Sequence, residues 1–161
     1  MMRGFIALGS NLGERAALLG EALKLMSSGG LTVVTASHLY ESAPEEVDEK
    51  QDSYLNMVVE FTFEGGVFEL LDRCQEVERS LGRIRPYPHA PRTMDIDILL
   101  IEGTEFMDER LKVPHPRLEQ RAFVMYPLAE IAPDLILPSG RTAAQVKKSL
   151  RNDEIRMIPG G

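Results

Sequence analysis

The chain is poor in the residues that perform thiol and zinc chemistry. Its 161 residues include one cysteine, three histidines and no tryptophan. A single cysteine excludes an intramolecular disulfide and suits a reducing compartment, so we expect a cytoplasmic protein. Cys74 lies on the apolar stripe of a predicted helix and is interpreted as a small core residue, not a nucleophile. The histidines are scattered, and no Cys/His cluster indicates zinc.

Long apolar runs and an excess of positive charge are also missing. The N-terminal run from Phe5 to Leu8 is too short for a signal peptide or a membrane span. The 25 acidic and 18 basic residues give a net charge of −7, which argues against nucleic acid as a general partner. The length and a hydrophobic content of 43% fit one domain over residues 1–161, and nothing indicates an obligate protein partner.

The apolar patterning predicts an α+β fold. Strands are expected at Arg3–Leu8, Leu31–Tyr40, Tyr54–Phe63 and around Asp95, with helices at Glu14–Ser27 and Val67–Leu81. This β-α-β-β-α-β order is the ferredoxin-like arrangement, here with an antiparallel or mixed sheet. Polar loops are expected at Glu41–Asp52 and Gly82–Arg92. A C-terminal extension from Gly103 contains predicted short helices at Glu119–Tyr126 and Thr142–Leu150.

Two aspartates, two positions apart, are the most informative residues of the chain. Asp95 and Asp97 open an apolar strand, and strand side chains alternate between faces, so both carboxylates point the same way, roughly 7 Å apart. Carboxylates placed together at the edge of an apolar strand repel each other and lose hydration. Mg2+ relieves both costs, and it commonly binds one or two carboxylates plus substrate phosphates. The alternative is a solvated strand end with Arg92 as a salt-bridge partner.

Cations surround these aspartates in the sequence, as an acidic protein that binds a polyphosphate requires. The arginines concerned are Arg79, Arg83, Arg85 and Arg92 before the pair, and Arg110, Arg117 and Arg121 after it. The turn at residues 9–13, between the first strand and the first helix, offers backbone N–H groups to an anion. Asn11 and Glu14 in this turn also fit a helix-capping box. Together these features point to phosphate chemistry.

Other polar residues allow two interpretations each. Glu78 falls inside the apolar arc of the second helix, where a carboxylate needs a partner, so it either serves a site or pairs with an arginine. Tyr54 and Asn56 share a strand face, and Asn56 suits the amide-like edge of a heterocycle, although periodicity alone favours an ordinary outward face. His115, between two prolines, can donate to a phosphate or stabilise a leaving group, whereas His38 is interpreted as structural.

Several motifs occur in a fixed order along the chain. They are Leu8-Gly9-Ser10-Asn11-Leu12-Gly13, Tyr54-Leu55-Asn56, Gly82-Arg83-Ile84-Arg85, Pro91-Arg92-Thr93-Met94-Asp95-Ile96-Asp97-Ile98-Leu99, Val113-Pro114-His115-Pro116-Arg117, Arg121-Ala122-Phe123 and Pro127-Leu128-Ala129-Glu130-Ile131-Ala132-Pro133. The set closely resembles the 6-hydroxymethyl-7,8-dihydropterin pyrophosphokinase family of folate synthesis, from about residue 6 to residue 138. The Arg-x-x-Asp-x-Asp block, taken with the His115 and Arg121 blocks, is its most specific part.

The resemblance implies that the β,γ-diphosphoryl group of ATP passes to the pterin hydroxymethyl oxygen and leaves AMP. It implies that Asp95 and Asp97 hold two Mg2+ ions, and that Arg83, Arg92 and Arg121 contact phosphates or order the loops. Nucleotide-side positions implied by the resemblance are Gln75, Glu78, Ile98, Arg110 and His115. Implied pterin-pocket positions are Ser42, Glu45, Tyr54, Asn56 and Phe123, with Asn56 at the amide edge of the pterin and Phe123 stacked on its ring.

Two segments depart from the family pattern. The family commonly has a further arginine and a tryptophan-glycine pair before the proline at position 91, so Tyr87 or His89 is expected to replace the stacking of that tryptophan. Glu45 stands where an apolar residue is usual. The loop at residues 82–91 is expected to close over ATP with Arg83 and Arg92 as its cationic anchors, since lids of this kind exclude water from charged groups. The alternative is a rigid surface loop whose prolines only stiffen the link between helix and strand.

Two other functional classes compete with this interpretation. A nucleotidyltransferase also combines a Gly-Ser turn with an Asp-x-Asp pair, but in that class the two elements lie close in sequence, whereas Ser10 and Asp95 lie far apart. A non-catalytic ligand-sensing module of the same fold is the second alternative. It leaves both the aspartate pair and the flanking arginines unexplained.

Overall fold

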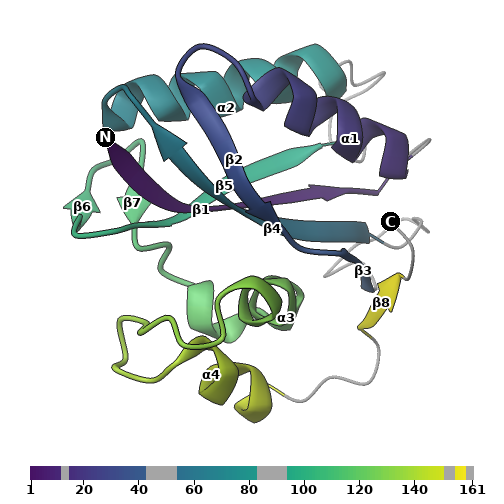
Figure 1. Ribbon diagram of the computed structural model, residues 1–161, viewed down its shortest axis with the longest axis vertical. Coiled ribbons are helices and arrows are strands. Elements are labelled where there is room, and N and C mark those ends of the chain that lie inside the picture. Colours follow the sequence, from purple (N-terminus) through teal and green to yellow (C-terminus); the bar gives the residue numbers. More distant parts are fainter. Residues whose placement is uncertain (12–14, 43–53, 83–93, 151–154, 159–161) are drawn as a thin grey trace.

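A six-stranded sheet forms the centre of the molecule, and helices lie on both of its faces (Figure 1). The structure is a computed structural model that describes residues 1–11, 15–42, 54–82, 94–150 and 155–158. The strands of the sheet are β1 (Met2–Ser10), β2 (Leu31–Ala36), β3 (Leu39–Ser42), β4 (Tyr54–Phe63), β5 (Asp95–Ile101) and β8 (Arg156–Ile158). A separate small sheet pairs β6 (Phe106–Met107) with β7 (Lys112–Val113).

The strand order is β5-β1-β4-β3-β8, and β2 pairs with β4 beyond the end of β3. Neighbouring strands of the sheet are antiparallel. The predicted α+β class and the β-α-β-β-α-β order are therefore confirmed. Strand β1 lies between β4 and β5. The first strand of the chain therefore joins β5, which carries both aspartates, to the other strands of the sheet.

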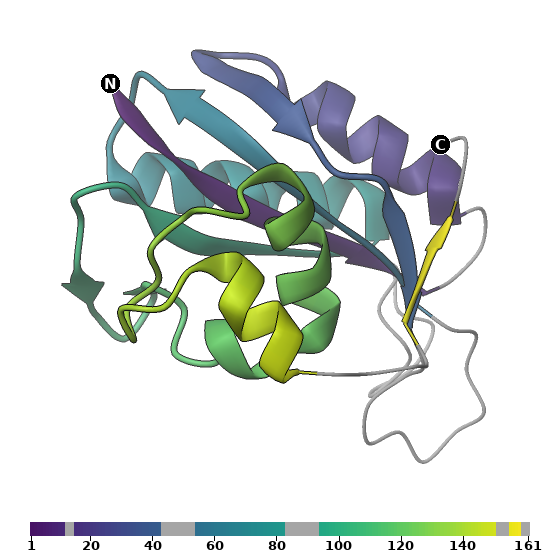
Figure 2. The same ribbon diagram turned by 60° about the horizontal axis from the view of Figure 1, so that its bottom comes forward.

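The helices form two layers on opposite faces of the sheet (Figures 1 and 2). Helices α1 (Arg15–Met26) and α2 (Val67–Gly82) cover one face, while α3 (Ala122–Ile131) and α4 (Ala143–Ser149) cover part of the other, preceded by the short 3-10 helix η1 (Leu118–Gln120). None of the helices in the described segments has the length and apolar character needed to cross a membrane.

Side-chain alternation on β4 separates two apolar cores. Leu55, Met57 and Phe61 pack in the core beneath α1 and α2, whereas Val58 packs in the core beneath α3 and α4. This period-2 pattern is the one predicted for Tyr54–Phe63. Burial of the largest of these side chains stabilises the fold by about 1.5–3 kcal/mol each relative to an exposed position.

The predicted strand Leu31–Tyr40 is wrong in one respect, because it is broken into β2 and β3 at Ser37 and His38. Ala36 pairs with Val59 but Tyr40 pairs with Asn56, so one extra residue is accommodated between them. The Ser37 hydroxyl accepts a hydrogen bond from the backbone N–H of Val58 at 3.0 Å. The Val58 N–H is thus bonded to a side-chain oxygen and not to the backbone carbonyl of a neighbouring strand, and serine side chains commonly accept such hydrogen bonds.

The helix predicted around Glu119–Tyr126 is present, but it is divided in two and extends further than predicted. The chain forms η1 over Leu118–Gln120, and α3 then runs from Ala122 to Ile131 through Pro127. Proline removes one backbone donor, yet Pro127 is buried together with Val124 and Leu128 in the core, and this burial outweighs the lost hydrogen bond. The second predicted helix is confirmed as α4, whose capping box joins Thr142 and Gln145.

The C-terminal strand β8 was not predicted. It has three residues, mostly exposed, and pairs with β3 so that Leu39 lies opposite Ile158. Glu41 on β3 contacts Arg156 at 2.5 Å and Arg15 of α1 at 3.3 Å. Glu41 and Ser42 therefore belong to a strand and not to the predicted polar loop, and residues 43–52 of that loop lie outside the described residues.

Glu130, near the end of α3, connects this helix to the region where β2 and β3 meet. Its carboxylate accepts hydrogen bonds from the Tyr40 hydroxyl at 2.8 Å and from the His38 backbone N–H at 3.0 Å, and it lies 2.8 Å from His38 Nδ1. Burial alone would raise the pKa of Glu130, but the donors of His38 and Tyr40 bring it below its ordinary value. His38 is structural, as predicted.

We expect Glu130→Ala to lower the free energy of unfolding at pH 7 by roughly 1–3 kcal/mol, because the Tyr40 hydroxyl loses its acceptor in a partly buried position. Urea denaturation measures the change, with the exposed Glu64→Ala as the matched control. Because the pKa of Glu130 is lowered by folding, its stabilisation is present above its unfolded pKa and is lost as the pH falls through its folded pKa. Equal stability of the variant and the wild type at pH 7 would contradict this assignment.

Candidate active site

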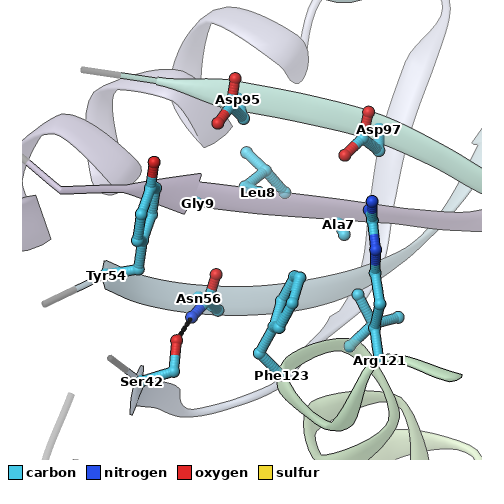
Figure 3. A pocket seen from close by; sticks show the side chains of 11 residues that line it. Ala7, Leu8, Gly9, Ser42, Tyr54, Asn56, Asp95, Asp97, Arg121 and Phe123 are labelled. Carbon is cyan, nitrogen blue, oxygen red and sulfur yellow. Dashed lines mark hydrogen bonds between the residues drawn. The ribbon is translucent and has the colours of Figure 1, made fainter. Parts of the chain in front are cut away.

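A cavity of about 260 Å³ opens on the face of the sheet that carries α3 (Figure 3). Four strands and the first turn of α3 contribute to its wall. The lining residues are Ala7, Leu8 and Gly9 of β1, Ser42 of β3, Tyr54 and Asn56 of β4, Asp95 and Asp97 of β5, and Arg121, Phe123 and Val124. The cavity therefore brings together residues from distant parts of the sequence.

Both aspartates of β5 line this cavity, as the strand periodicity predicts. Asp95 is partly buried and Asp97 is exposed, while Ile96 between them is buried in the core on the other face. The β1 residues opposite the pair are small: Gly9 pairs with Asp95, and Ala7 pairs with Asp97. This absence of large side chains leaves room in front of the carboxylates.

Glu78 of α2 supports the same strand from the opposite side. Its Oε2 accepts a hydrogen bond from the backbone N–H of Ile96 at 2.8 Å, between the two aspartates. The Glu78 carboxylate therefore holds the start of β5 through its backbone, a contact that neither sequence interpretation named. Gln75, almost one turn earlier on α2, is partly buried, and Ile98 is buried in the core; neither lines the cavity.

Cys74 is a core residue, as predicted. Its side chain is buried among the apolar residues beneath α2. Burial, followed by the charges of Glu78 and Asp97, raises the pKa of the Cys74 thiol to about 12. A thiol that remains protonated at neutral pH is a poor nucleophile.

The opposite wall of the cavity is formed by an amide and aromatic rings. Asn56 is buried, and its Nδ2 donates a hydrogen bond to Ser42 Oγ at 2.8 Å. Tyr54 lies two residues earlier on the same face of β4, and the Phe123 ring approaches from the start of α3 (Figure 3). A planar heterocycle suits such a wall, because the rings can stack on it while the amide contacts its edge.

Arg121 places a cation at the aspartate side of the cavity (Figure 3). Its guanidinium carbon lies 5.6 Å from the centre of the Phe123 ring. The Nε atom is buried and finds no hydrogen-bond partner among the described residues. A buried donor without a partner is costly, so this guanidinium is well suited to an anionic ligand.

His115 presents a defined tautomer next to this site. Its backbone N–H donates to Leu99 O at 2.7 Å, and its Nδ1 accepts from the Arg117 backbone N–H at 3.1 Å. The ring proton therefore resides on Nε2. Burial lowers the pKa of His115; Asp97 opposes this effect, and Arg121 and Arg117 add to it. His115 does not line the cavity, but it lies within electrostatic reach of Asp97.

Arg110 is not part of the cavity wall. Its guanidinium contacts Asp72 of α2 at 2.6 Å and lies 5.2 Å from the centre of the Phe68 ring. The family resemblance assigns three more residues to the site, but they lie outside the described residues: Arg83, Arg92 and Glu45. The same holds for Tyr87 and His89 of the expected closing loop.

Sequence reasoning missed the contribution of β1. Ala7, Leu8 and Gly9 line the cavity, although the turn after them attracted attention only as an anion-binding candidate. A signal was present, because Ala7 and Gly9 are small residues two positions apart on a buried strand. Such a pair leaves one strand face open where neighbouring strands carry functional side chains.

We expect the His115 imidazole to be neutral at pH 7, with its proton on Nε2, because its pKa is lowered and its Nδ1 already accepts a hydrogen bond. Long-range proton–nitrogen NMR correlations of the imidazole measure the tautomer directly, and His38 in the same spectrum provides an internal comparison. A proton on Nδ1, or a charged ring at pH 7, would contradict the geometry.

Comparisons with known proteins agree with these features. Residues 5–133 match the family model for 7,8-dihydro-6-hydroxymethylpterin-pyrophosphokinase (HPPK). A 2-amino-4-hydroxy-6-hydroxymethyldihydropteridine pyrophosphokinase from Methylorubrum extorquens is 42% identical over 159 residues, which cover 98% of this chain and 99% of the relative. The corresponding enzyme from Bacillus subtilis is 44% identical over 128 residues, covering 79% of this chain and 76% of the relative.

Among solved structures, wild-type HPPK-DHPS from Plasmodium falciparum with STZ-DHP superposes with a TM-score of 0.72 at 14% identity. The match covers 98% of this chain but only 46% of that longer chain, and at this identity it supports the fold alone. The family model covers residues 5–133, and the two relatives named above are 42% and 44% identical to this chain. The chain therefore belongs to the 7,8-dihydro-6-hydroxymethylpterin-pyrophosphokinase family.

Proposed function

We propose that this protein transfers the diphosphate group of ATP to 6-hydroxymethyl-7,8-dihydropterin, giving the pterin diphosphate and AMP in folate biosynthesis. The observation that supports it best is the composition of one small cavity, in which an aspartate pair faces an amide and two aromatic rings. One edge suits phosphates with their metal ions, and the other suits a flat heterocycle. Family membership adds the identity of the two substrates. We also propose that the protein acts in the cytoplasm and needs no protein partner for this reaction.

The pterin end of the cavity consists of Ser42, Tyr54, Asn56 and Phe123 in this proposal. Asn56 provides a donor and an acceptor to the ring edge, and the Phe123 ring stacks on the ring face. Such contacts hold the hydroxymethyl oxygen in a defined place, which reduces the entropy that the transfer step must otherwise lose. Glu45 is proposed as a further pterin contact from the segment outside the described residues.

The carboxylates of Asp95 and Asp97 are chemically suited to bind two Mg2+ ions. Both carboxylates line the cavity, and the described residues contain no cluster of three acidic, histidine or cysteine side chains that would form a complete metal cage. Mg2+ typically combines one or two carboxylates with substrate phosphates, so Asp95 and Asp97 provide the protein's share of the ligands. When bound, the ions neutralise phosphate charge and align the two reactants.

The remaining groups bind and orient the nucleotide. The unpartnered Nε of Arg121 and the Nε2–H of His115 are donors for phosphate oxygens. Glu78 contributes by holding the backbone of β5 between the aspartates. Gln75, Ile98 and Arg110 complete the proposed nucleotide side, with Arg110 leaving Asp72 to reach it. Arg83 and Arg92 are proposed as catalytic cations that stabilise charge developing on the transferred group.

Incubation of the protein with ATP, Mg2+ and the reduced pterin is expected to yield AMP and a pterin diphosphate in equal amounts. Phosphorus NMR distinguishes these products from ADP and from free pyrophosphate, and omission of the pterin serves as the control for simple ATP hydrolysis. Stoichiometric formation of ADP would indicate single phosphoryl transfer, and pyrophosphate release would indicate nucleotidyl transfer. Either result overturns the proposed function.

Asp95→Asn and Asp97→Asn are each expected to lower kcat by at least roughly 100-fold, because each removes a carboxylate that would hold the Mg2+ ions against the charge of the phosphates. Each substitution should lower kcat far more than it lowers folding stability, since it relieves carboxylate repulsion in the metal-free protein. Asp134→Asn, at an exposed position away from the cavity, is the matched control. Calorimetry with Mg2+ and an unreactive ATP analogue provides a second measurement. Near-native turnover at saturating Mg2+ would exclude the metal assignment.

A further inference from the structure

We propose that Glu130 is a positioning residue that fixes the register in which β3 pairs with β4, and that this register determines which side chain of β3 lines the cavity. In the observed register that side chain is Ser42 (Figure 3). Glu130 itself does not line the cavity. The inference rests on the proposed function in one respect, because it takes the end of the cavity beside Ser42 as the pterin end.

The pairing of the chain with β4 shifts by one residue between β2 and β3. The Ser37 backbone N–H donates to Val58 O at 2.9 Å, which continues the register of β2. Three residues later, Tyr40 lies opposite Asn56. The two residues in between are therefore opposite a single residue of β4, as in a β-bulge. Without this shift, Tyr40 would lie opposite Leu55.

A shift of one residue exchanges the two faces of β3. Residues directly opposite each other in a sheet point to the same face, so Ser42 shares the cavity face with its partner Tyr54. Without the shift, Glu41 would be the partner of Tyr54 and would point into the cavity. A third carboxylate would then lose hydration and be repelled by the aspartate pair. The register therefore decides whether a neutral hydroxyl or a negative charge lines the pterin end.

The apolar pattern of β3 does not by itself select this register. The strand reads Leu39-Tyr40-Glu41-Ser42, so each face receives one apolar and one polar residue in either register. Only three residues of β3 are paired with β4. A short strand without strict alternation has a weakly specified register. Contacts from other elements are therefore needed to determine it.

Glu130 of α3 provides such contacts at the point where the register shifts. Its carboxylate accepts hydrogen bonds from the His38 backbone N–H at 3.0 Å and from the Tyr40 hydroxyl at 2.8 Å. His38 is one of the two residues of the bulge, and Tyr40 is only 3% exposed. Without the shift, the Tyr40 ring would point to the opposite face of the sheet, away from α3. Hydrogen bonds to a carboxylate are stronger than those between neutral groups, and this set forms only in the observed register.

Glu41 supports the same register from the other face of the sheet. Its carboxylate contacts Arg15 of α1 at 3.3 Å and Arg156 of β8 at 2.5 Å. The Arg156 side chain is 71% exposed, and exposed ion pairs contribute little. The hydrogen bonds between Glu130 and the β3 region are therefore the stronger determinant.

The test begins with a direct measurement of the register by NMR. Cross-strand contacts between backbone protons are expected to pair Tyr40 with Asn56 in the wild type. In Glu130→Ala these contacts should be lost or should move to Leu39, while the contacts between β1 and β4 remain. Glu130→Gln should keep the wild-type contacts, because its amide oxygen still accepts from the Tyr40 hydroxyl and the His38 N–H.

Calorimetry then measures the effect on the ligands. With Mg2+ and an unreactive ATP analogue present, Glu130→Ala should bind 6-hydroxymethylpterin roughly 10-fold more weakly, as expected when about one tenth of the molecules keep the competent register. Its affinity for the ATP analogue alone should stay within about twofold, because β1 and β4 separate β3 from the aspartate strand β5. Glu130→Gln should bind both ligands as the wild type does.

The matched control for stability is Val146→Ala. Val146 of α4 is fully buried in the core to which α3 contributes, so its truncation lowers stability but leaves the hydrogen bonds of Glu130 in place. If Glu130 acted through stability alone, both alanine variants would affect pterin binding alike and would keep Tyr40 opposite Asn56. That result would overturn the inference and leave the proposed function standing.

Two further results are decisive. A wild type that binds no pterin overturns the proposed function, and the NMR register of Glu130→Ala then decides the inference alone. If Glu130→Ala does not fold, Tyr40→Phe replaces it, because this variant keeps the ring and removes one donor to Glu130. A loss of about threefold or more in pterin affinity, with weakened contacts between β3 and β4, is expected of it. Wild-type contacts and affinity in Tyr40→Phe would refute the proposed role of Glu130.

Discussion

Strand β1 pairs along its length with β4 on one side and with β5 on the other, and the geometry of the cavity depends on this double pairing. Gly9 is the backbone partner of both Asn56 and Asp95, so the hydrogen bonds of one strand set the separation between the amide edge and the carboxylate edge. Backbone hydrogen bonds in a buried sheet are collectively rigid. The two halves of the site are therefore positioned by the most stable part of the fold and not by loops.

The same sheet carries a conventional apolar core on its other face. On β5, Ile96 and Ile98 pack beneath α1 and α2 while Asp95 and Asp97 face the cavity, so alternate residues of one strand have opposite functions. Helix α3 covers only part of the cavity face, and its first turn supplies Arg121 and Phe123 at the boundary. Polar side chains on β3, β4 and β5 line a cavity there, because the covering layer of helices does not extend over them.

Features that repeat with a regular period were predictable from the sequence. The alternation on β4, the common face of the aspartates and the apolar stripe of α2 each follow from a single element and its periodicity. Features that depend on another part of the chain were not. The break at Ser37 and His38 requires Val58 and Glu130 as partners, and the continuation of α3 through Pro127 requires burial against α4 and the sheet. The role of Glu78 as a support for Ile96 likewise needed the packing of α2 on β5.

Gly9 has a consequence for inhibition and resistance. Because a side chain at this position would collide with the Asn56 amide, and because its backbone also pairs with Asp95, a substitution there would disturb both ends of the cavity together. Resistance to an inhibitor normally arises where a residue can change without loss of the natural reaction. A compound that takes most of its contact area from the backbone of Gly9 and its neighbours on β1 would rest on a surface that the protein has little freedom to alter.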